Sequence, residues 1–334
     1  MKSSIGALCI LFVLTAACVS AAPDTGANES LVSFFVEPFL QKGLGGTAYD
    51  LSTSAGSGNS WLSRLEFPQI PLEAGIALGA TIEHEGRKQW LFEAGFSHST
   101  LPIAGTMTDS DWIWTPPYPR TLYSYTESND ATVSWRASLE AAWTFASAEK
   151  GSISLYAAYR YQSISHVENS LIGWDWNPML LPTPTVYVIP YTTADVLEYT
   201  LTAHEPGLGL MADFEPLHGL SIELRACFTP VYVSDIDDHK LRTKLSTASG
   251  WGPGVYANLR GMYQFPRYFK SFSTYIVLES ELISYTVSTT QTQYWYGNAD
   301  FLQGGPSQGT TYTGIGHVIT STQYQIGLRL GFMF

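Results

Sequence analysis

Hydrophobic and polar residues alternate along several long segments of the chain. In the last of these segments the apolar set is Tyr324, Ile326, Leu328, Leu330, Phe332 and Phe334. A period of two places the two sets on opposite faces of a β-strand. The pattern recurs at 133–145, 153–161 and 220–228, where every charged residue falls on the polar face. These segments therefore predict strands with one apolar and one polar face.

The connections between the predicted strands differ in length in a regular way. The expected strands are near 44–54, 60–84, 88–100, 121–145, 152–166, 194–214, 219–234, 250–264, 272–291 and 317–334. Short connections fall near 146–151, 215–219 and 265–271, and long ones near 102–120, 168–193, 234–249 and 295–316. A soluble sandwich explains the alternation but not this asymmetry, which is typical of outer-membrane barrels. We predict an all-β fold, a ten-stranded antiparallel transmembrane β-barrel with long extracellular loops.

The composition supports a membrane protein that crosses with strands. Charged residues make up 14% of the chain, whereas soluble domains carry about 25%. Tyrosine and tryptophan gather near predicted strand ends, for example Tyr123, Tyr161 and Trp251, as interfacial girdles require. The formal net charge of −12 disfavours nucleic acid as a partner and favours basic peptides.

The N-terminus predicts export. Lys2 precedes an apolar run over 5–17, and small residues follow at 19–21, which is the pattern of a signal peptide spanning residues 1–21. The run is shorter than the roughly 20 residues of a membrane-spanning helix. Residues 22–334 then form a single barrel domain in the bacterial outer membrane. Of the three cysteines this domain keeps Cys227 alone, so no internal disulfide is expected.

Two acidic clusters outside the predicted strand interiors carry the candidate chemistry. Asp109 and Asp111 lie on a predicted long loop. Asp237 and His239 lie where a predicted strand leads into a second long loop. An aspartate that accepts a proton from histidine fixes its tautomer and makes the imidazole a general base, with an acid limb near pH 6 for an ordinary imidazole. Two carboxylates in a shielded cleft share a proton. Each cluster alone also fits a solvated turn, and 235–239 also fits a metal site.

Taken together, the clusters resemble the two catalytic segments of the omptins, a family of outer-membrane aspartyl-type endopeptidases. Met-x-Asp-x-Asp-Trp at 107–112 and Ser-Asp-x-Asp-x-His at 234–239 match that family position by position and in the same order. The resemblance implies a catalytic set of Asp109, Asp111, Asp237 and His239, acting on a water nucleophile.

The resemblance also implies a specificity and an environment. Asp50 and Asp235 match the acids that bind a basic side chain beside the scissile bond, so basic peptides or proteins are the expected substrates. No cofactor and no metal is expected, lipopolysaccharide or another outer-membrane lipid is a candidate activator, and the active site is expected to face the cell exterior. The alternative function is a non-proteolytic barrel that acts as an adhesin or binding protein. A diffusion porin is disfavoured because side chains fill a ten-stranded lumen.

Overall fold

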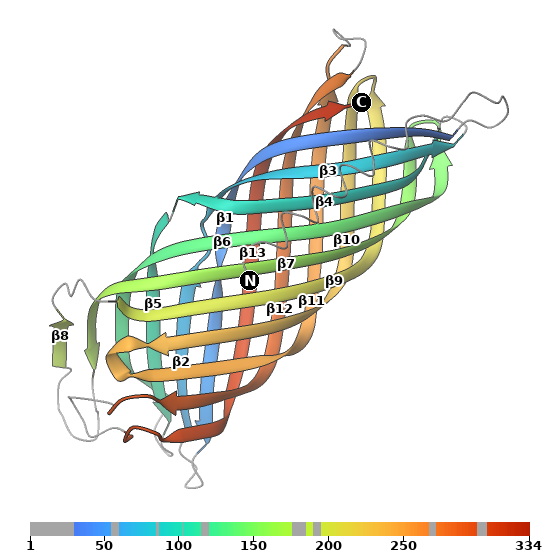
Figure 1. Cartoon of the computed structure of the whole chain (residues 1–334). Helices are drawn as coiled ribbons and strands as arrows, with labels where there is room; N and C mark the ends of the chain where they lie inside the picture. The colour runs from blue at the N-terminus through green and yellow to red at the C-terminus, as the bar shows by residue number, and fades with distance from the viewer. Residues whose placement is uncertain are drawn as a thin grey trace.

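The computed structural model describes residues 30–54, 60–84, 87–101, 103–114, 120–175, 185–189, 195–266, 272–298 and 306–334; the predicted signal peptide lies outside them. The strands are β1 Ser30–Ser54, β2 Ser60–Pro68, β3 Leu72–His84, β4 Arg87–Leu101, β5 Ile103–Trp114, β6 Thr121–Ala148, β7 Gly151–Asp175, β8 Thr185–Ile189, β9 Asp195–Leu217, β10 Leu220–His239, β11 Lys244–Gln264, β12 Ser273–Trp295 and β13 Thr311–Met333, with a 3-10 turn η1 at Lys240–Arg242 (Figure 1).

The strands close into one antiparallel ring. β1 pairs with β13 over 16 positions from Phe35↔Met333 to Ser52↔Gly316, and this pairing joins the two ends of the chain order. β3 and β2 pair in succession with β1, and β4 and β5 pair in succession with β6, so each of these pairs forms one interrupted strand. β8 pairs with β7 alone. When each interrupted strand is counted once and β8 is left out, the described strands occupy ten positions around the ring. The predicted all-β barrel is confirmed.

The strands run further toward one end of the barrel than the alternation predicted. The loops expected at 102–120 and 234–249 are largely strand, because β5 covers Ile103–Trp114 and β10 continues to His239 before a tight turn into β11. The first strand starts at Ser30 rather than near residue 44. The end that holds η1 and the β1–β2, β5–β6 and β12–β13 connections is called the mouth below.

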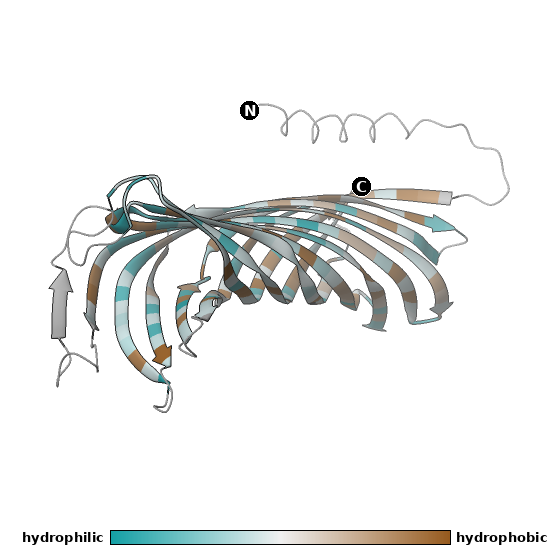
Figure 2. Ribbon diagram, turned by 90° about the horizontal axis from the view of Figure 1, so that it is seen from below, coloured by the Kyte–Doolittle hydropathy of each residue, from teal (hydrophilic) through white to brown (hydrophobic). Residues whose placement is uncertain are grey.

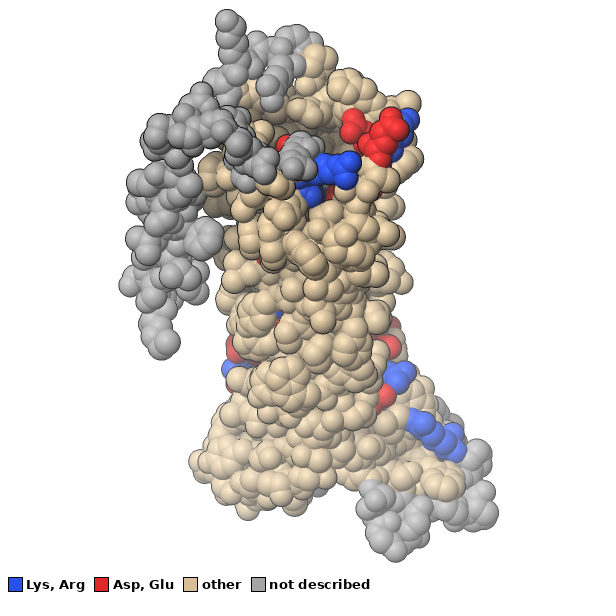
Figure 3. Space-filling view, turned by 90° about the vertical axis from the view of Figure 1, so that its right-hand side faces the viewer, with Lys and Arg blue, Asp and Glu red and all other residues tan. Residues whose placement is uncertain are grey.

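The outside of the barrel is apolar over a broad belt. Leucine side chains point outward around the ring, including Leu40, Leu139, Leu155, Leu210, Leu224, Leu259, Leu278 and Leu328, each 44–62% exposed. Figure 2 shows the alternation of apolar and polar positions along the strands, and Figure 3 shows a wide uncharged band on the face in view. A soluble protein would hide such a surface, so the belt is the lipid-facing part of a transmembrane barrel. No helix of the described residues is long and apolar enough to cross a membrane.

Within this belt the lumen is filled by charged side chains that pair with one another. Arg260 Nη2 donates to Glu37 Oε2 at 2.8 Å, Arg329 Nη1 to Glu93 Oε1 at 3.0 Å, and Arg225 Nη2 to Glu93 Oε2 at 3.1 Å. All five residues are at least largely buried. A buried charge is tolerated when it is paired and hydrogen-bonded. This layer occupies the space that an open pore would need.

Candidate active site

The two acidic clusters lie on strands from nearly opposite sides of the mouth. Asp109 and Asp111 are on β5, on the same face as the buried Met107, and Asp237 is on β10, fully buried and facing the lumen. In the order of the ring, β6, β7 and β9 separate β5 from β10 on one side, while β2, β1, β13, β12 and β11 do so on the other. The closure of the barrel, rather than the chain order, brings the clusters to the same end of the lumen, where Lys244 interacts electrostatically with acids of both.

Asp237 and His239 form a close pair. His239 Nε2 lies 3.1 Å from Asp237 Oδ2, and both side chains are buried or nearly so. Their two-residue spacing puts them on one face of extended backbone, as the sequence predicted. Tyr49, which is fully buried on β1, donates its hydroxyl proton to the same Oδ2. The tyrosine and the imidazole together fix the orientation of the Asp237 carboxylate.

Asp109 and Asp111 share a polar neighbour on β2. Ser63 Oγ donates to Asp109 Oδ1 at 3.2 Å, and the backbone of Ser63 is in register with Asp111. Asp111 is 7% exposed, and its Oδ1 makes no hydrogen bond to a described residue. The β5–β6 register shifts between Asp111 and Trp112; such irregularities re-aim side chains and are frequent beside active sites.

Lys244, the first residue of β11, connects the two clusters electrostatically. It is buried, and its ammonium interacts with the carboxylates of Asp237, Asp109 and Asp111. Its pKa is lowered to about 8 by burial and by Arg242, against the pull of these acids. A cation among three carboxylates keeps part of their negative charge in place at neutral pH. The sequence analysis did not identify Lys244.

The site lies beyond the lipid-facing belt. On β10 the exposed apolar residues Ile222, Leu224 and Phe228 lie in the half of the strand away from the site, while Ile236 is exposed beside Asp237, which is nine residues beyond Phe228. At about 3.3 Å per residue this is roughly 30 Å along the strand. The aromatic pair Tyr232–Trp251, with ring centroids 5.3 Å apart, falls between belt and site, as an interfacial girdle would.

Burial and charge set the protonation states of the site. Burial, with help from Lys244 and Arg242, lowers the pKa of His239 to about 4 although Asp237 opposes the change, so the imidazole is neutral at pH 7. Burial and the neighbouring Asp111 raise the pKa of Asp109 to about 7, so this couple holds a proton for part of the time. Burial opposes ionisation of Asp237, yet His239 and Tyr49 lower the pKa of this carboxyl below its usual value. The site therefore combines a neutral base, an ionised partner and a carboxylate couple that holds a proton for part of the time.

Of the two predicted specificity acids, only Asp235 faces the lumen. Asp235 is 1% exposed, accepts from His317 Nε2 at 2.8 Å, and lies 3.4 Å from the Tyr199 hydroxyl. Asp50 is on the outer face of β1, because the lumen position beside it belongs to Tyr49, and it forms a bidentate pair with Arg64 at 2.6 and 2.7 Å. The structure does not bring Asp50 to the site, so the expected pairing of Asp50 with Asp235 is wrong.

An aromatic layer closes the lumen below the site. Tyr49, Phe67, Tyr199 and His317 are each at most 1% exposed, and the rings of Phe67 and Tyr199 stack with centroids 4.4 Å apart. The layer separates the site from the ion-paired part of the lumen. A substrate can therefore reach the acids from the mouth and not through the part of the lumen below them.

A cleft of about 980 Å³ opens at the mouth; its lining includes Trp112, the chain neighbour of Asp111, but none of the four predicted catalytic residues. Its walls are rich in aromatic side chains, including Trp61, Trp112, Trp114, Trp295 and Tyr312. The Arg120 guanidinium already lies over the Trp112 ring, 5.2 Å from its centroid. A cleft of this size and character can hold an extended peptide, since the aromatic faces bind both apolar and cationic side chains.

The comparisons with known proteins give a fold and no family. No protein-family model matches the chain, and no curated protein matches it significantly. The outer membrane protease OmpT from Escherichia coli has a similar structure, with a TM-score of 0.71 and 13% identity over 94% of this chain and 99% of that one. OprG from Pseudomonas aeruginosa covers 92% and 97% at 8% identity and a TM-score of 0.29. The chain thus has an outer-membrane β-barrel fold of the omptin type.

The residues that sequence reasoning missed come from other strands. Tyr49, Ser63 and Lys244 each contact or polarise a predicted acid. None of them belongs to an acidic cluster in the sequence, and the place of Tyr49 beside Asp50 drew attention to the wrong residue. The burial of Thr47 and Leu51 shows that alternate residues of this part of β1, Tyr49 among them, face the lumen, and the sequence alone gives no such signal.

Proposed function

We propose that the protein is an outer-membrane endopeptidase that hydrolyses peptides next to basic residues and acts at the cell exterior. The observation that carries the proposal is that a neutral, Asp-paired imidazole and a proton-sharing carboxylate couple lie at the same end of the lumen, with Lys244 interacting electrostatically with both. An adhesin that only binds has no physical reason to keep such a costly arrangement of buried titratable groups. Outer-membrane lipid surrounds the apolar belt in this proposal.

The proposed reaction uses water as the nucleophile. His239 donates its Nε2–H in a hydrogen bond to Asp237, so its Nδ1 keeps a free lone pair. This nitrogen takes a proton from water, and the water oxygen bonds to the peptide carbonyl carbon. The protonated carboxyl of the Asp109–Asp111 couple donates to the developing oxyanion, and the nearby Lys244 stabilises the same charge. His239 then returns its proton to the leaving amine as the C–N bond breaks. The products are a carboxylate and an amine, with no covalent enzyme intermediate.

The preference for basic residues is proposed on three grounds. Asp109, Asp111, Asp235 and Asp237 give the mouth side of the lumen an excess of carboxylates that attracts cationic side chains. The tryptophan faces of the cleft bind guanidinium groups, as the position of Arg120 over Trp112 illustrates. Asp235 has one oxygen, Oδ1, without a hydrogen-bond partner among the described residues, so it can accept from a substrate arginine that reaches it.

Peptide cleavage by the refolded protein tests the proposal. Peptides with a central Arg-Arg, Lys-Lys or Ala-Ala bond would be incubated with the wild type and with two histidine variants, and the products mapped by mass spectrometry. We expect cleavage at the basic bonds, loss of cleavage in His239→Ala, and full activity in His218→Ala, since His218 is an exposed residue at the far end of the barrel. Binding of all three peptides without cleavage would favour the adhesin, and equal cleavage of Ala-Ala would refute the basic preference.

A further inference from the structure

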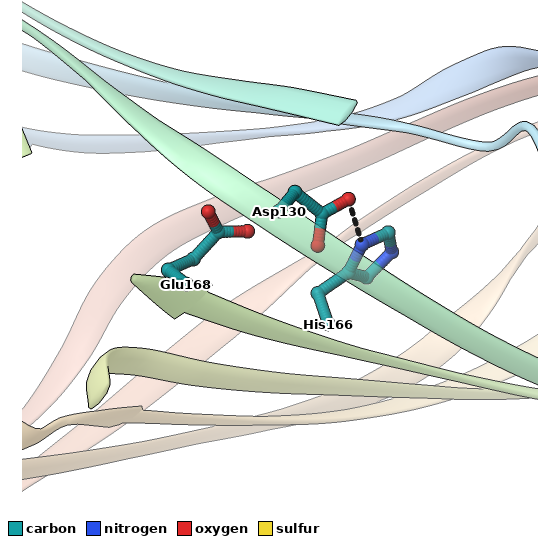
Figure 4. Close-up of side chains that lie close together, drawn as sticks. All are labelled: Asp130, His166 and Glu168. Atoms are coloured by element: carbon teal, nitrogen blue, oxygen red, sulfur yellow. Dashed lines mark hydrogen bonds and ion pairs between the residues drawn. The ribbon is translucent and has the colours of Figure 1, made fainter. Parts of the chain in front are cut away.

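A second group of titratable residues lies on the lumen wall away from the catalytic residues. Asp130 is on β6, and His166 and Glu168 are on β7; Asp130 is in register with Glu168, and Thr132 with His166. The three side chains are between 0% and 2% exposed. Figure 4 shows the Asp130 carboxylate between Glu168 on one side and the His166 imidazole on the other. The proposed proteolytic chemistry uses none of them.

Each member of the group offers a donor atom to the same small space. One ligand atom from each residue can be chosen so that all three lie within 4.8 Å of one another, and His166 Nδ1 is 2.9 Å from Asp130 Oδ2. Ligands around a single tetrahedral zinc ion are about 3.4 Å apart, given metal–ligand distances near 2.1 Å. Small side-chain rotations therefore bring the set to coordination distance.

The surroundings orient these donors but leave three atoms unsatisfied. Thr132 Oγ1 donates to Asp130 Oδ2 at 2.8 Å, and Ser128 Oγ donates to Glu168 Oε2 at 2.7 Å. Asp130 Oδ1, His166 Nε2 and Glu168 Oε1 are buried and make no hydrogen bond to a described residue. Hydroxyls that hold carboxylates in place in this way are also found around bound metals.

We propose that Asp130, His166 and Glu168 bind a divalent transition-metal cation of the zinc type. Two carboxylates placed side by side in a closed lumen carry two negative charges that require two positive charges to balance them, and the neighbouring hydroxyls carry none. The imidazole selects zinc and its neighbours in the first transition series over calcium and magnesium, which prefer oxygen ligands alone. The cation would join β6 to β7 below the mouth.

This site is separate from the catalytic dyad and does not depend on peptide hydrolysis. The Phe67 ring lies between them, with its centroid 4.9 Å from that of His166 and 5.9 Å from that of Tyr49, the residue that holds Asp237. The metal site proposed for 235–239 on sequence grounds is a different one. The proposal revises the expectation that the protein uses no metal, and it assigns the ion a cross-strand role rather than one in the reaction.

Metal titration of the refolded protein tests the proposal. After treatment with EDTA and dialysis, zinc would be titrated by calorimetry, and cobalt by its visible absorption bands. We expect one equivalent to bind to the wild type, with affinity reduced at least about tenfold in Glu168→Gln and in His166→Ala. Glu205→Gln is the matched control, because Glu205 is also a buried lumen glutamate without a hydrogen-bond partner among the described residues, and it should bind as the wild type does.

A second measurement keeps the test valid if a variant fails to refold. Zinc should raise the temperature at which the wild-type barrel loses its compact gel mobility, by the mass action of binding to the folded state. Absence of zinc binding to the wild type would overturn the proposal and leave a proton-sharing cluster in its place. Binding that survives in Glu168→Gln and His166→Ala, or that disappears in His239→Ala, would also overturn it by placing the ion elsewhere.

Discussion

Tyr49→Phe removes one hydroxyl from below the proposed catalytic dyad and changes little else. Tyr49 is fully buried, and its hydroxyl donates to Asp237 Oδ2, the oxygen that also faces His239 Nε2. A hydrogen bond to a charged group contributes about 1.5–3 kcal/mol, and 1.4 kcal/mol is a factor of ten in rate. If most of that contribution serves to hold Asp237 against the imidazolium of the transition state, kcat should fall by about 10- to 100-fold.

The assay is steady-state hydrolysis of an internally quenched Arg-Arg peptide by the refolded variant. KM should change little, because Tyr49 lies below Asp237 and away from the cleft. Tyr199→Phe is the matched control: Tyr199 belongs to the same aromatic layer, but its hydroxyl lies 3.4 Å from Asp235 rather than on the dyad, so its kcat should stay within about twofold of wild type. If Tyr49→Phe is as active as Tyr199→Phe, the hydroxyl does not support the dyad and the reasoning is refuted.

Four further outcomes follow from the same structure. Lys244→Met should move the acid limb of kcat/KM from near pH 4 to higher pH, because the lysine charge lowers the pKa of His239 and the base must be neutral to act; an unmoved limb in a pH–rate profile would contradict this. Asp50→Asn should leave Arg-over-Ala selectivity unchanged when competing peptides are compared, since Asp50 is held by Arg64 on the outer face; reduced selectivity would return Asp50 to the pocket. EDTA should lower the unfolding temperature of the barrel without abolishing peptide hydrolysis; loss of hydrolysis restored by zinc would make the ion catalytic. The unheated protein should migrate faster in gels than the boiled protein and give a strand-dominated circular dichroism spectrum, because a closed barrel leaves no strand edge exposed; a helical spectrum would exclude the fold.

The belt was predictable from sequence because lipid and lumen impose opposite demands on successive residues. Above the belt both faces of a strand meet water or polar groups, so the alternation disappears and β5 and the end of β10 read as loops. The start of β1 was missed for another reason: Phe35 and Phe39 point into the lumen while Pro38 points outward. Glycines on β3 make room for these rings, since a side chain at Gly79 would come within 2.2 Å of Phe35.

The site was predictable in part because the acids keep a two-residue spacing that survives in any extended backbone. Their meeting across the ring, the tyrosine under Asp237 and the lysine between the clusters depend on register between strands far apart in the chain. The near-normal imidazole pKa expected from sequence for His239 took no account of burial, which lowers the pKa of this imidazole to about 4 against the effect of Asp237. The spacing of residues in the sequence does not show which side chains are buried. It also does not show which alternate residues face the lumen in a strand such as β1, whose lumen face is not polar.

The central claim is that the two clusters act as one unit in the same reaction, His239 on the attacking water and the Asp109–Asp111 couple on the developing oxyanion. Its most direct test is a double-mutant cycle on Arg-Arg peptide turnover, with wild type, Asp109→Asn, His239→Ala and the double variant, each checked for heat-dependent gel mobility. General-base assistance is worth about 10²–10⁴-fold, so each single variant should lose at least about a hundredfold, and the double variant should be little slower than the slower single one. Wild-type turnover retained in His239→Ala, or losses that multiply in the double variant, would contradict the account.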